Sequence, residues 1–342
     1  FFQAEDGIRD RSPSRGLGDV YKRQVLITGI TGQDGSFLAR DIALKYPDSY
    51  IYGVSRNKDT TEFFNRIRNL GVINIDKFKI FNIDLLNLKE ICNLISALEL
   101  TAIFNLSGPS SVYESLQNPK LAHNQITLIF DNLIKSLQMN SLKIPFYQAS
   151  SSEMFGKGDS EILTENSNFC PESPYAKAKL QNHNKVIELS QDFDIKSGIM
   201  FNHESEFRQE KFLFSKIITN AAKIKRGTVK KFTVGSLTYE RDWLFAGDVT
   251  KAMMRIMEDG KQNSYIIGSG KSHSIKYLIS IIFNFYGLNW QDYVDVDSNL
   301  LRKKDPEKIY CNPERLINEL NWKPEYSFEQ LVERCIINNK FS

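Results

Sequence analysis

From Val25 onward, short apolar runs alternate along the chain with longer segments that have the spacing of helices. The apolar runs are rich in β-branched and aromatic residues and read VLITGI, YIYGVSR, FKIFNIDL, AIFNLSG, IPFYQASS and IKSGIMFN. Helices are expected between them, for example at SFLARDIALKY, over residues 119–137 and from near Pro174. Nearly continuous apolar strands separated by helices indicate a parallel sheet that is covered on both faces. The predicted fold class is α/β, a doubly wound parallel sheet that binds ligands beyond the carboxyl ends of its strands.

The alternation becomes irregular after about residue 200. Short strands are expected at KFTVG and SYIIGSG, and helices at 274–286 and 327–338. We therefore expect residues 25–200 to form the doubly wound domain, with about 240–258 returning to it. Residues 201–342 should form mainly a smaller lobe that binds the substrate.

The first 24 residues show neither strand nor helix periodicity and read FFQAEDGIRDRSPSRGLGDVYKRQ. The segment resembles a translated sequencing adapter, so we expect a non-native extension in place of the native start of the first strand. A disordered native extension is the alternative. The polar and charged character of these 24 residues is not that of a secretory signal.

Composition narrows the classes of function. The chain has 342 residues, and a net charge of +3 from 44 basic and 41 acidic residues is too small to predict a nucleic-acid surface. No apolar run in the sequence approaches the roughly 18 residues that a membrane-spanning helix needs. The cysteines share no C-x-x-C pairing, so neither a zinc site nor a disulfide framework is expected, and a reducing cytoplasm fits. They are Cys92, Cys170, Cys311 and Cys335.

A glycine-rich segment, LITGITGQDGSFL, follows the first predicted strand and opens the first predicted helix. Glycines at such a turn let the backbone approach a pyrophosphate at the positive end of the helix, so the segment predicts a dinucleotide site. The loops after the third and fourth predicted strands should hold the adenine and the ribose. The cofactor contacts expected from these segments are Thr28, Gly29, Thr31, Gly32, Gln33, Asp34, Gly35, Asp84, Leu85, Leu106, Ser107, Gly108 and Ser110.

The second predicted strand ends with Arg56, where a NAD site would carry an acidic residue. A carboxylate there would repel a 2′-phosphate, whereas a guanidinium group binds one through paired hydrogen bonds. The expected cofactor is therefore NADP. The alternative is that Arg56 is an ordinary exposed arginine on a loop.

Tyr175 and Lys179 stand four apart in SPYAKAK, at the start of a predicted helix and on one of its faces. A tyrosine has a pKa near ~10, and a neighbouring ammonium group, helped by a positively charged nicotinamide, favours the phenolate that a base needs. The run QASSSEMFG, at the end of the preceding predicted strand, adds hydroxyl groups that can relay a proton. These residues predict oxidation of a carbinol, as in dehydrogenases, epimerases and reductases, but they leave Glu153 without a role.

Several motifs together resemble the GDP-mannose 4,6-dehydratase family, in the extended branch of the short-chain dehydrogenase/reductase superfamily. They run from Val25 almost to the C-terminus and read LITGITGQDGSFLA, YQASSSEMFGK, PESPYAKAK, FNHES, RDW and LNWKP. The resemblance implies that Tyr175 and Lys179 serve oxidation at carbon 4 of a hexose, with Ser151 as the proton relay. It also implies that Glu153 removes the proton of carbon 5, after which water leaves from carbon 6 and hydride returns there.

The same resemblance implies a nucleotide-sugar site, with GDP-mannose as the expected substrate. His203 and Arg208 are expected near the cofactor. The substrate contacts that it implies are Ser152, Asn202, Lys216, Arg241 and Arg302. A homo-oligomer, either a dimer or a tetramer, is expected as well. The chain departs from the family where NHES continues as EFRQ instead of P-R-R-G.

Two related enzymes and one non-enzyme remain as alternatives. A reductase or epimerase acting on a 4-keto-6-deoxy sugar nucleotide needs no eliminating base, and Glu153 argues against it. A 4,6-dehydratase for dTDP- or CDP-hexoses is the second alternative, although the dTDP type usually has an aspartate where this chain has Ser152. A non-catalytic NADP-binding protein of the same fold is the third, and it would not need the intact tyrosine, lysine and glutamate.

Overall fold

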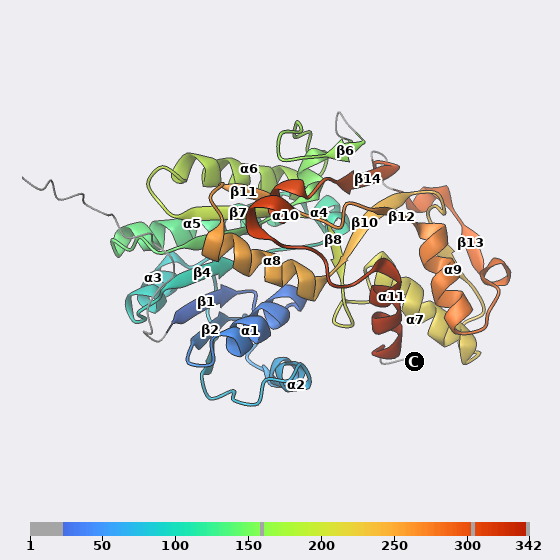
Figure 1. Cartoon of the computed structure of the whole chain (residues 1–342), viewed down its shortest axis with the longest axis horizontal. Coiled ribbons are helices and arrows are strands. Elements are labelled where there is room, and N and C mark those ends of the chain that lie inside the picture. Colours follow the sequence, from blue (N-terminus) through green and yellow to red (C-terminus); the bar gives the residue numbers. More distant parts are fainter. Residues whose placement is uncertain (1–22, 158–160, 302–304, 340–342) are drawn as a thin grey trace, which may run out of the picture.

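Seven parallel strands form the central sheet, in the order β11-β7-β5-β4-β1-β2-β3 (Figure 1). The structure is a computed structural model that describes residues 23–157, 161–301 and 305–339. The strands of this sheet are β1 (Gln24–Thr28), β2 (Tyr50–Val54), β3 (Phe78–Phe81), β4 (Ala102–Asn105), β5 (Phe146–Ser151), β7 (Ile195–Met200) and β11 (Ser264–Ile267). The doubly wound parallel sheet predicted from the sequence is confirmed.

Helices cover both faces of the central sheet. One face carries α1 (Gln33–Lys45), α2 (Thr61–Asn69), α8 (Ala246–Asp259) and α10 (Glu314–Leu320). The other face carries α3 (Leu88–Ser96), α5 (Pro119–Met139) and α6 (Pro174–Leu189), and the short α4 (Val112–Gln117) packs on α5 and α6.

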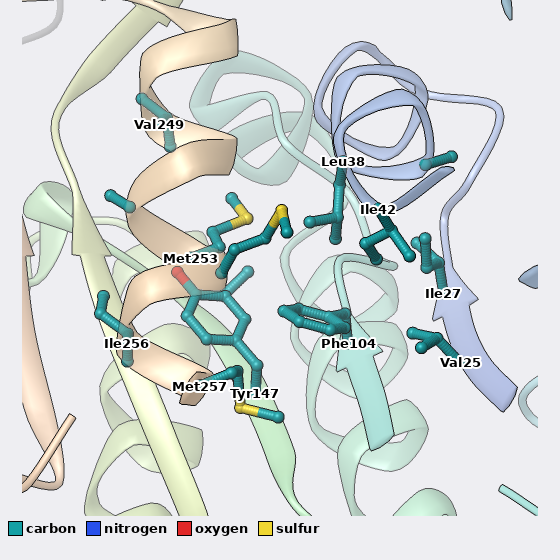
Figure 2. Packing of buried hydrophobic residues seen from close by; sticks show 14 of the residues in the cluster. Val25, Ile27, Leu38, Ile42, Phe104, Tyr147, Val249, Met253, Ile256 and Met257 are labelled. Carbon is teal, nitrogen blue, oxygen red and sulfur yellow. The ribbon is translucent and has the colours of Figure 1, made fainter. Parts of the chain in front are cut away.

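The strands supply apolar side chains to both layers because successive residues point to opposite faces. In β1, Ile27 belongs to the hydrophobic cluster beneath α1 and α8, whereas Leu26 belongs to the cluster beneath α3 and α5. Figure 2 shows the first cluster, in which Leu38 of α1 and Met253 of α8 lie over Phe104 of β4. Both faces of the sheet are therefore covered mainly by apolar side chains.

The second lobe is built on a five-stranded sheet, in which β12-β10-β14-β6 are neighbours and β8 pairs with β10. Its strands are β6 (Ile162–Leu163), β8 (Asn202–Glu204), β10 (Glu240–Phe245), β12 (Ser272–Ser274) and β14 (Lys308–Cys311). A separate two-stranded sheet consists of β9 (Phe232–Val234) and β13 (Val294–Val296). The helices of this lobe, which pack on one another, are α7 (Leu213–Lys225), α9 (Ile275–Phe285) and α11 (Phe328–Ile337). Short 3₁₀ turns are formed by Ser152–Phe155, Trp290–Asp292 and Ser298–Leu300.

The chain crosses between the two lobes more than once. α8 and β11 bring it back to the central sheet, and α10 does so again near the C-terminus. β10, which occupies the first part of the segment 240–258, pairs in the second sheet instead.

At the N-terminal end of the described residues, the Tyr50 N–H donates to the Arg23 carbonyl oxygen at 2.7 Å, and Gln24 is the first residue of β1. The boundary expected after residue 24 therefore falls inside the strand, and residues 1–22 lie outside the described residues.

None of the helices in the described part of the chain combines the length and the apolar character that a membrane crossing requires.

Candidate active site

A cavity of about 530 Å³ lies between the carboxyl edge of the central sheet and the second lobe. Its walls come from the segments after β1, β4 and β5, from α6 and α7, and from β8 and β10. This is the edge where β1 and β4 lead to opposite sides of a doubly wound sheet, the usual place for a nucleotide. The predicted site residues that line the cavity are Asp34, Leu106, Gly108, Ser110, Ser151, Ser152, Glu153, Tyr175, Lys179, Asn202, His203, Arg208, Lys216 and Arg241.

Other predicted residues do not line this cavity but lie in or shortly after β1, β2, β3 and β4. They are Thr28, Gly29, Thr31, Gly32, Gln33, Gly35, Arg56, Asp84, Leu85 and Ser107. Arg302 lies outside the described residues.

The glycine turn after β1 has the shape that a pyrophosphate site requires. Gly29 has a φ of +72°, which favours glycine, and its carbonyl oxygen accepts from the Gly32 N–H at 3.0 Å. A Cβ at Gly35 would lie 2.4 Å from the Gly29 carbonyl oxygen and 2.5 Å from the Cα of Ile30. Gly32, the residue before α1, has no side chain that could cap the helix, so no side chain occupies the place of an anion at the positive end of α1. The turn is therefore a cradle that side chains at these positions would fill.

The arginine predicted at the cofactor site is Arg56, but the arginine that contacts the glycine turn is Arg66. Arg56 follows β2, is exposed, and forms no ion pair with any residue in the described part of the chain. Arg66 of α2 instead donates to the Thr31 carbonyl oxygen and to the Ser36 hydroxyl, each at 3.1 Å. Arg66 thus fixes the turn from outside, and nothing in the helical pattern around it distinguishes it from a surface arginine.

A chain of buried hydrogen bonds connects the glycine turn with Lys179. The Thr28 hydroxyl donates to Asn105 Oδ1 at 2.7 Å, and Asn105 Nδ2 donates to Gln148 Oε1 at 2.8 Å. Gln148 Nε2 and Lys179 Nζ both donate to the Ala149 carbonyl oxygen, at 3.0 Å and 2.9 Å. Burial lowers the pKa of Lys179 to about 8. The predictions missed Asn105 and Gln148, although both are polar residues inside otherwise apolar strands.

Tyr175 and Lys179 lie one turn apart on α6, as their spacing predicted. The Lys179 ammonium nitrogen is 5.7 Å from the centre of the Tyr175 ring. Burial raises the pKa of Tyr175 to about 12, although a hydrogen bond with the Ser151 hydroxyl acts in the opposite direction. The sequence predicts that an ammonium group and a bound, positively charged nicotinamide together favour the phenolate. In the protein alone, burial of the phenol dominates, and Lys179 is directed to the Ala149 carbonyl oxygen.

The serine run and Glu153 lie directly beside the phenol. Ser151 is the last residue of β5, and its hydroxyl oxygen accepts from the Glu153 backbone N–H at 3.3 Å. This hydrogen bond caps the 3₁₀ turn that begins at Ser152 and brings the Glu153 side chain to the cavity wall. The Ser151 side chain also forms a hydrogen bond with the Tyr175 phenol.

His203 and Asp34 form an ion pair that was not predicted, although both were expected near the cofactor. His203 Nε2 lies 3.0 Å from Asp34 Oδ2, and His203 Nδ1 lies 2.7 Å from the Phe201 carbonyl oxygen. Because both ring nitrogens face acceptors, the imidazole carries both protons and is charged. Burial disfavours the charged form of each group, but their mutual attraction outweighs it. The pKa of His203 is raised, and that of Asp34 falls to about 2.

Three cationic residues, from the segment 211–216 at the start of α7 and from β10, line what we call the far end of the cavity, and two of them are already paired. Arg241 contacts Asp305 at 3.0 Å, and Lys211 contacts Glu114 at 2.7 Å. Lys216 of α7 is exposed at the cavity wall and has no carboxylate partner among the described residues. Lys216 is thus available to an anionic ligand, whereas Arg241 would share its charge with Asp305.

Comparison with known proteins places this geometry in a family. The model of a family described as GDP-mannose 4,6 dehydratase matches residues 26–335. The chain is 30% identical to GDP-mannose 4,6 dehydratase 2 of Arabidopsis thaliana over 325 residues, which cover 92% of this chain and 86% of the relative.

Solved structures with lower identity share the fold. A UDP-glucose-4-epimerase from Stenotrophomonas maltophila with bound NAD superposes with a TM-score of 0.80, at 17% identity, over 92% of this chain and 97% of that one. RMD from Pseudomonas aeruginosa complexed with NADPH has a TM-score of 0.76, at 20% identity, over 93% of this chain and 98% of that one.

Proposed function

The chain belongs to the GDP-mannose 4,6-dehydratase family, and we propose that it converts GDP-mannose to GDP-4-dehydro-6-deoxy-mannose and water. The observation that carries this proposal is the position of Glu153. Its side chain lines the same cavity as Tyr175, Ser151 and Lys179. A carboxylate beside a carbinol-oxidising group provides the base that elimination needs and simple hydride transfer does not.

The residues around the glycine turn fit a nicotinamide dinucleotide. The turn offers close backbone approach and the positive end of α1, and the segment 106–110 lines the adjoining wall. When bound there, the dinucleotide would accept a hydride from carbon 4 of the sugar and return it to carbon 6. The fold accommodates either NAD or NADPH in other proteins, so it does not decide between them. Arg56, exposed and without an ion-pair partner in the described part of the chain, supports NADP.

Tyr175 is proposed to take the proton of the carbon 4 hydroxyl. Its phenol holds its own proton at neutral pH in the protein alone, because burial keeps its pKa at about 12. Ser151 contacts this phenol and can pass the proton onward. Lys179 lies on the same face of α6 as Tyr175, and its ammonium group is held by a hydrogen bond to the Ala149 carbonyl oxygen. From there its positive charge is proposed to stabilise negative charge on the phenol.

Glu153 is proposed to remove the proton of carbon 5 once carbon 4 is a ketone. The ketone makes that proton acidic, because the carbanion is stabilised as an enolate. Loss of the carbon 6 hydroxyl as water then leaves an alkene between carbons 5 and 6. Hydride addition at carbon 6 and a proton at carbon 5 complete the sequence, which is redox-neutral overall.

The far end of the cavity is proposed to hold the nucleotide diphosphate. Lys216 provides a positive charge that has no carboxylate partner among the described residues, and Arg241 provides a second one near Asp305. Asn202 and Ser152 also line the cavity and are proposed to contact the hexose hydroxyls.

We further propose that the protein is a cytoplasmic homo-oligomer, either a dimer or a tetramer. Exposed apolar side chains on neighbouring helices support an interface between copies. Tyr113 of α4 is 68% exposed, and Leu121 and Leu128 of α5 are 57% and 45% exposed.

A panel of GDP-, dTDP-, CDP- and UDP-hexoses tests the proposed function, with mass spectrometry to detect loss of water. The account expects water loss from GDP-mannose without accumulation of reduced cofactor. Water loss from another nucleotide sugar alone would move the assignment to a different 4,6-dehydratase. Reduction or epimerisation of a 4-keto-6-deoxy sugar nucleotide would favour the reductase alternative. Cofactor binding without any turnover would favour a non-catalytic NADP-binding protein.

The variant Glu153→Gln separates elimination from oxidation within the same panel. The amide keeps the size of the side chain but cannot accept a proton, so slow oxidation at carbon 4 should remain while water loss stops. Unimpaired dehydration by this variant would show that Glu153 is not the base that removes the proton of carbon 5.

A further inference from the structure

The turn after β8, formed by residues 205–208, contacts the glycine-rich segment and the helices α1 and α2 beside the central sheet. The Ser205 hydroxyl donates to Oε1 of Gln33 in the glycine-rich segment at 2.8 Å. The Phe207 ring lies 5.3 Å from the ring of Phe37 in α1, and the Arg66 guanidinium group lies 4.6 Å from the Phe207 ring. The turn is therefore tied to both α1 and α2.

Glu206, which lies between Ser205 and Phe207, contacts the C-terminal helix α11 instead. Arg334 of α11 binds Glu206 with two nitrogens, Nη2 to Oε1 at 2.6 Å and Nε to Oε2 at 3.1 Å. The Glu206 side chain is only 8% exposed, and that of Arg334 is 27% exposed. Arg334 Nη1 also donates to the Tyr326 hydroxyl at 3.1 Å, and its guanidinium group lies 4.7 Å from the Phe245 ring. The Arg334 side chain is thus itself fixed, which makes it a rigid support.

Two cationic residues at this turn line the cavity. His203 lies two positions before the turn and forms the ion pair with Asp34. Arg208 is the last residue of the turn, contacts Glu204 at 3.0 Å, and stacks on the Phe212 ring with a separation of 3.6 Å. A displacement of the turn would therefore move His203 and Arg208 relative to the other residues of the cavity wall.

We propose that Glu206 and Arg334 are positioning residues, through which α11 holds the 205–208 turn and so sets the places of His203 and Arg208 at the dinucleotide end of the cavity. The effect on the cofactor rests on the proposed function, whereas the support of the turn by α11 does not. Neither side chain lines the cavity, so their influence is transmitted through the turn. Removal of one partner leaves the other charge largely buried and without its partner, which favours a displaced turn.

Hydrogen exchange of the free protein tests the support itself. The variants are Glu206→Gln, Arg334→Gln and the double variant, in which neither charge remains. The control is Arg255→Gln on α8, whose exposed partner Asp259 lies one turn away at 3.6 Å. The Phe207 and Arg208 amides bond within the turn, to the Ser205 hydroxyl and carbonyl oxygens. We expect the segment 205–212 to exchange roughly tenfold faster in each single variant, with no further gain in the double variant, because the two residues act as one unit.

NADP⁺ titration of the same proteins tests the consequence for binding. Dissociation constants should rise roughly fivefold or more in the three pair variants and stay unchanged in Arg255→Gln. Unfolding temperatures measured in parallel separate this effect from a loss of stability, because a merely stabilising ion pair would lower the unfolding temperature and leave the dissociation constant of the folded protein unchanged.

Two results would overturn the proposal. One is exchange of 205–212 at the wild-type rate in all folded variants. The other is faster exchange combined with unchanged NADP⁺ affinity. If the wild-type protein binds neither NADP⁺ nor NAD⁺, the proposed function fails, and the exchange result still decides whether α11 supports the turn.

Discussion

The substitution Asp34→Asn is predicted to destabilise the protein through the buried ion pair with His203. Asparagine keeps the shape of the side chain, but the charged imidazole loses its counter-ion. The pKa of Asp34 falls from an ordinary 3.8 to about 2 in the folded protein. Each pKa unit corresponds to about 1.4 kcal/mol, so ionised Asp34 stabilises the fold by about 2–3 kcal/mol, mainly through His203 and to a smaller extent through Gln33 and Arg208. The two side chains are 12% and 23% exposed, so solvent screens them little. For a chain of this length, that loss lowers the unfolding temperature by about 3 °C.

The destabilisation has a predicted pH window. The Asp34 contribution is fully present above its ordinary pKa of 3.8 and is lost as the pH falls toward 2. The His203 contribution is fully present below its ordinary pKa of 6.5 and is lost as the pH rises through its raised value in the folded protein. The difference between wild type and variant should therefore be largest between about pH 4 and pH 6.5 and should shrink under alkaline conditions.

Thermal unfolding of the free protein, followed by circular dichroism across this pH range, measures the effect. The control is Asp295→Asn, because Asp295 is 56% exposed in its pair with Lys231 and should contribute less than about 1 kcal/mol. An unfolding temperature unchanged by Asp34→Asn near pH 6 would refute the charged pair. So would a decrease of equal size at every pH.

Three further substitutions address the other parts of the site. Tyr175→Phe removes the phenolic oxygen and should lower kcat by roughly 10²–10⁴ at an unchanged unfolding temperature, and steady-state kinetics that match wild type would exclude a role in proton transfer. Arg56→Ser should weaken NADP⁺ binding about tenfold or more in calorimetric titrations while NAD⁺ binding is unchanged, and an equal loss for both would show that Arg56 does not contact the 2′-phosphate. Gly35→Ala places a Cβ 2.4 Å from the Gly29 carbonyl oxygen, so about 1–3 kcal/mol of stability should be lost, as measured by denaturant unfolding. Wild-type stability in that variant would mean that the turn is less tightly packed than the structure indicates.

The central sheet and the glycine turn were predictable because their signals are local. Strand and helix periodicity extends over a few residues, and Gly29 and Gly35 mark a turn whose geometry only glycine allows. The pairing of Tyr175 with Lys179 was predictable for the same reason, since four residues make one helical turn.

The ion pairs and the ionisation of the site were not predictable, because they depend on residues far apart in the sequence. Asp34 and His203 are separated by 169 positions, and Glu206 and Arg334 by 128. The raised pKa of Tyr175 in the protein alone could not be read from the motif, because burial, which packing determines, outweighs the influence of neighbouring groups. A motif therefore located the chemistry, but the three-dimensional packing set its electrostatics.

GDP-mannose labelled with deuterium at carbon 4 tests whether one cavity oxidises the sugar, eliminates water and reduces the sugar again. The labelled substrate is incubated with the enzyme and a catalytic amount of NADP⁺, and the product is analysed by mass spectrometry and NMR. We expect a product lighter by one water, with the deuterium at carbon 6 and no accumulation of reduced cofactor. Deuterium that leaves the sugar and appears in accumulating reduced cofactor would show that the hydride is not returned within the same cavity.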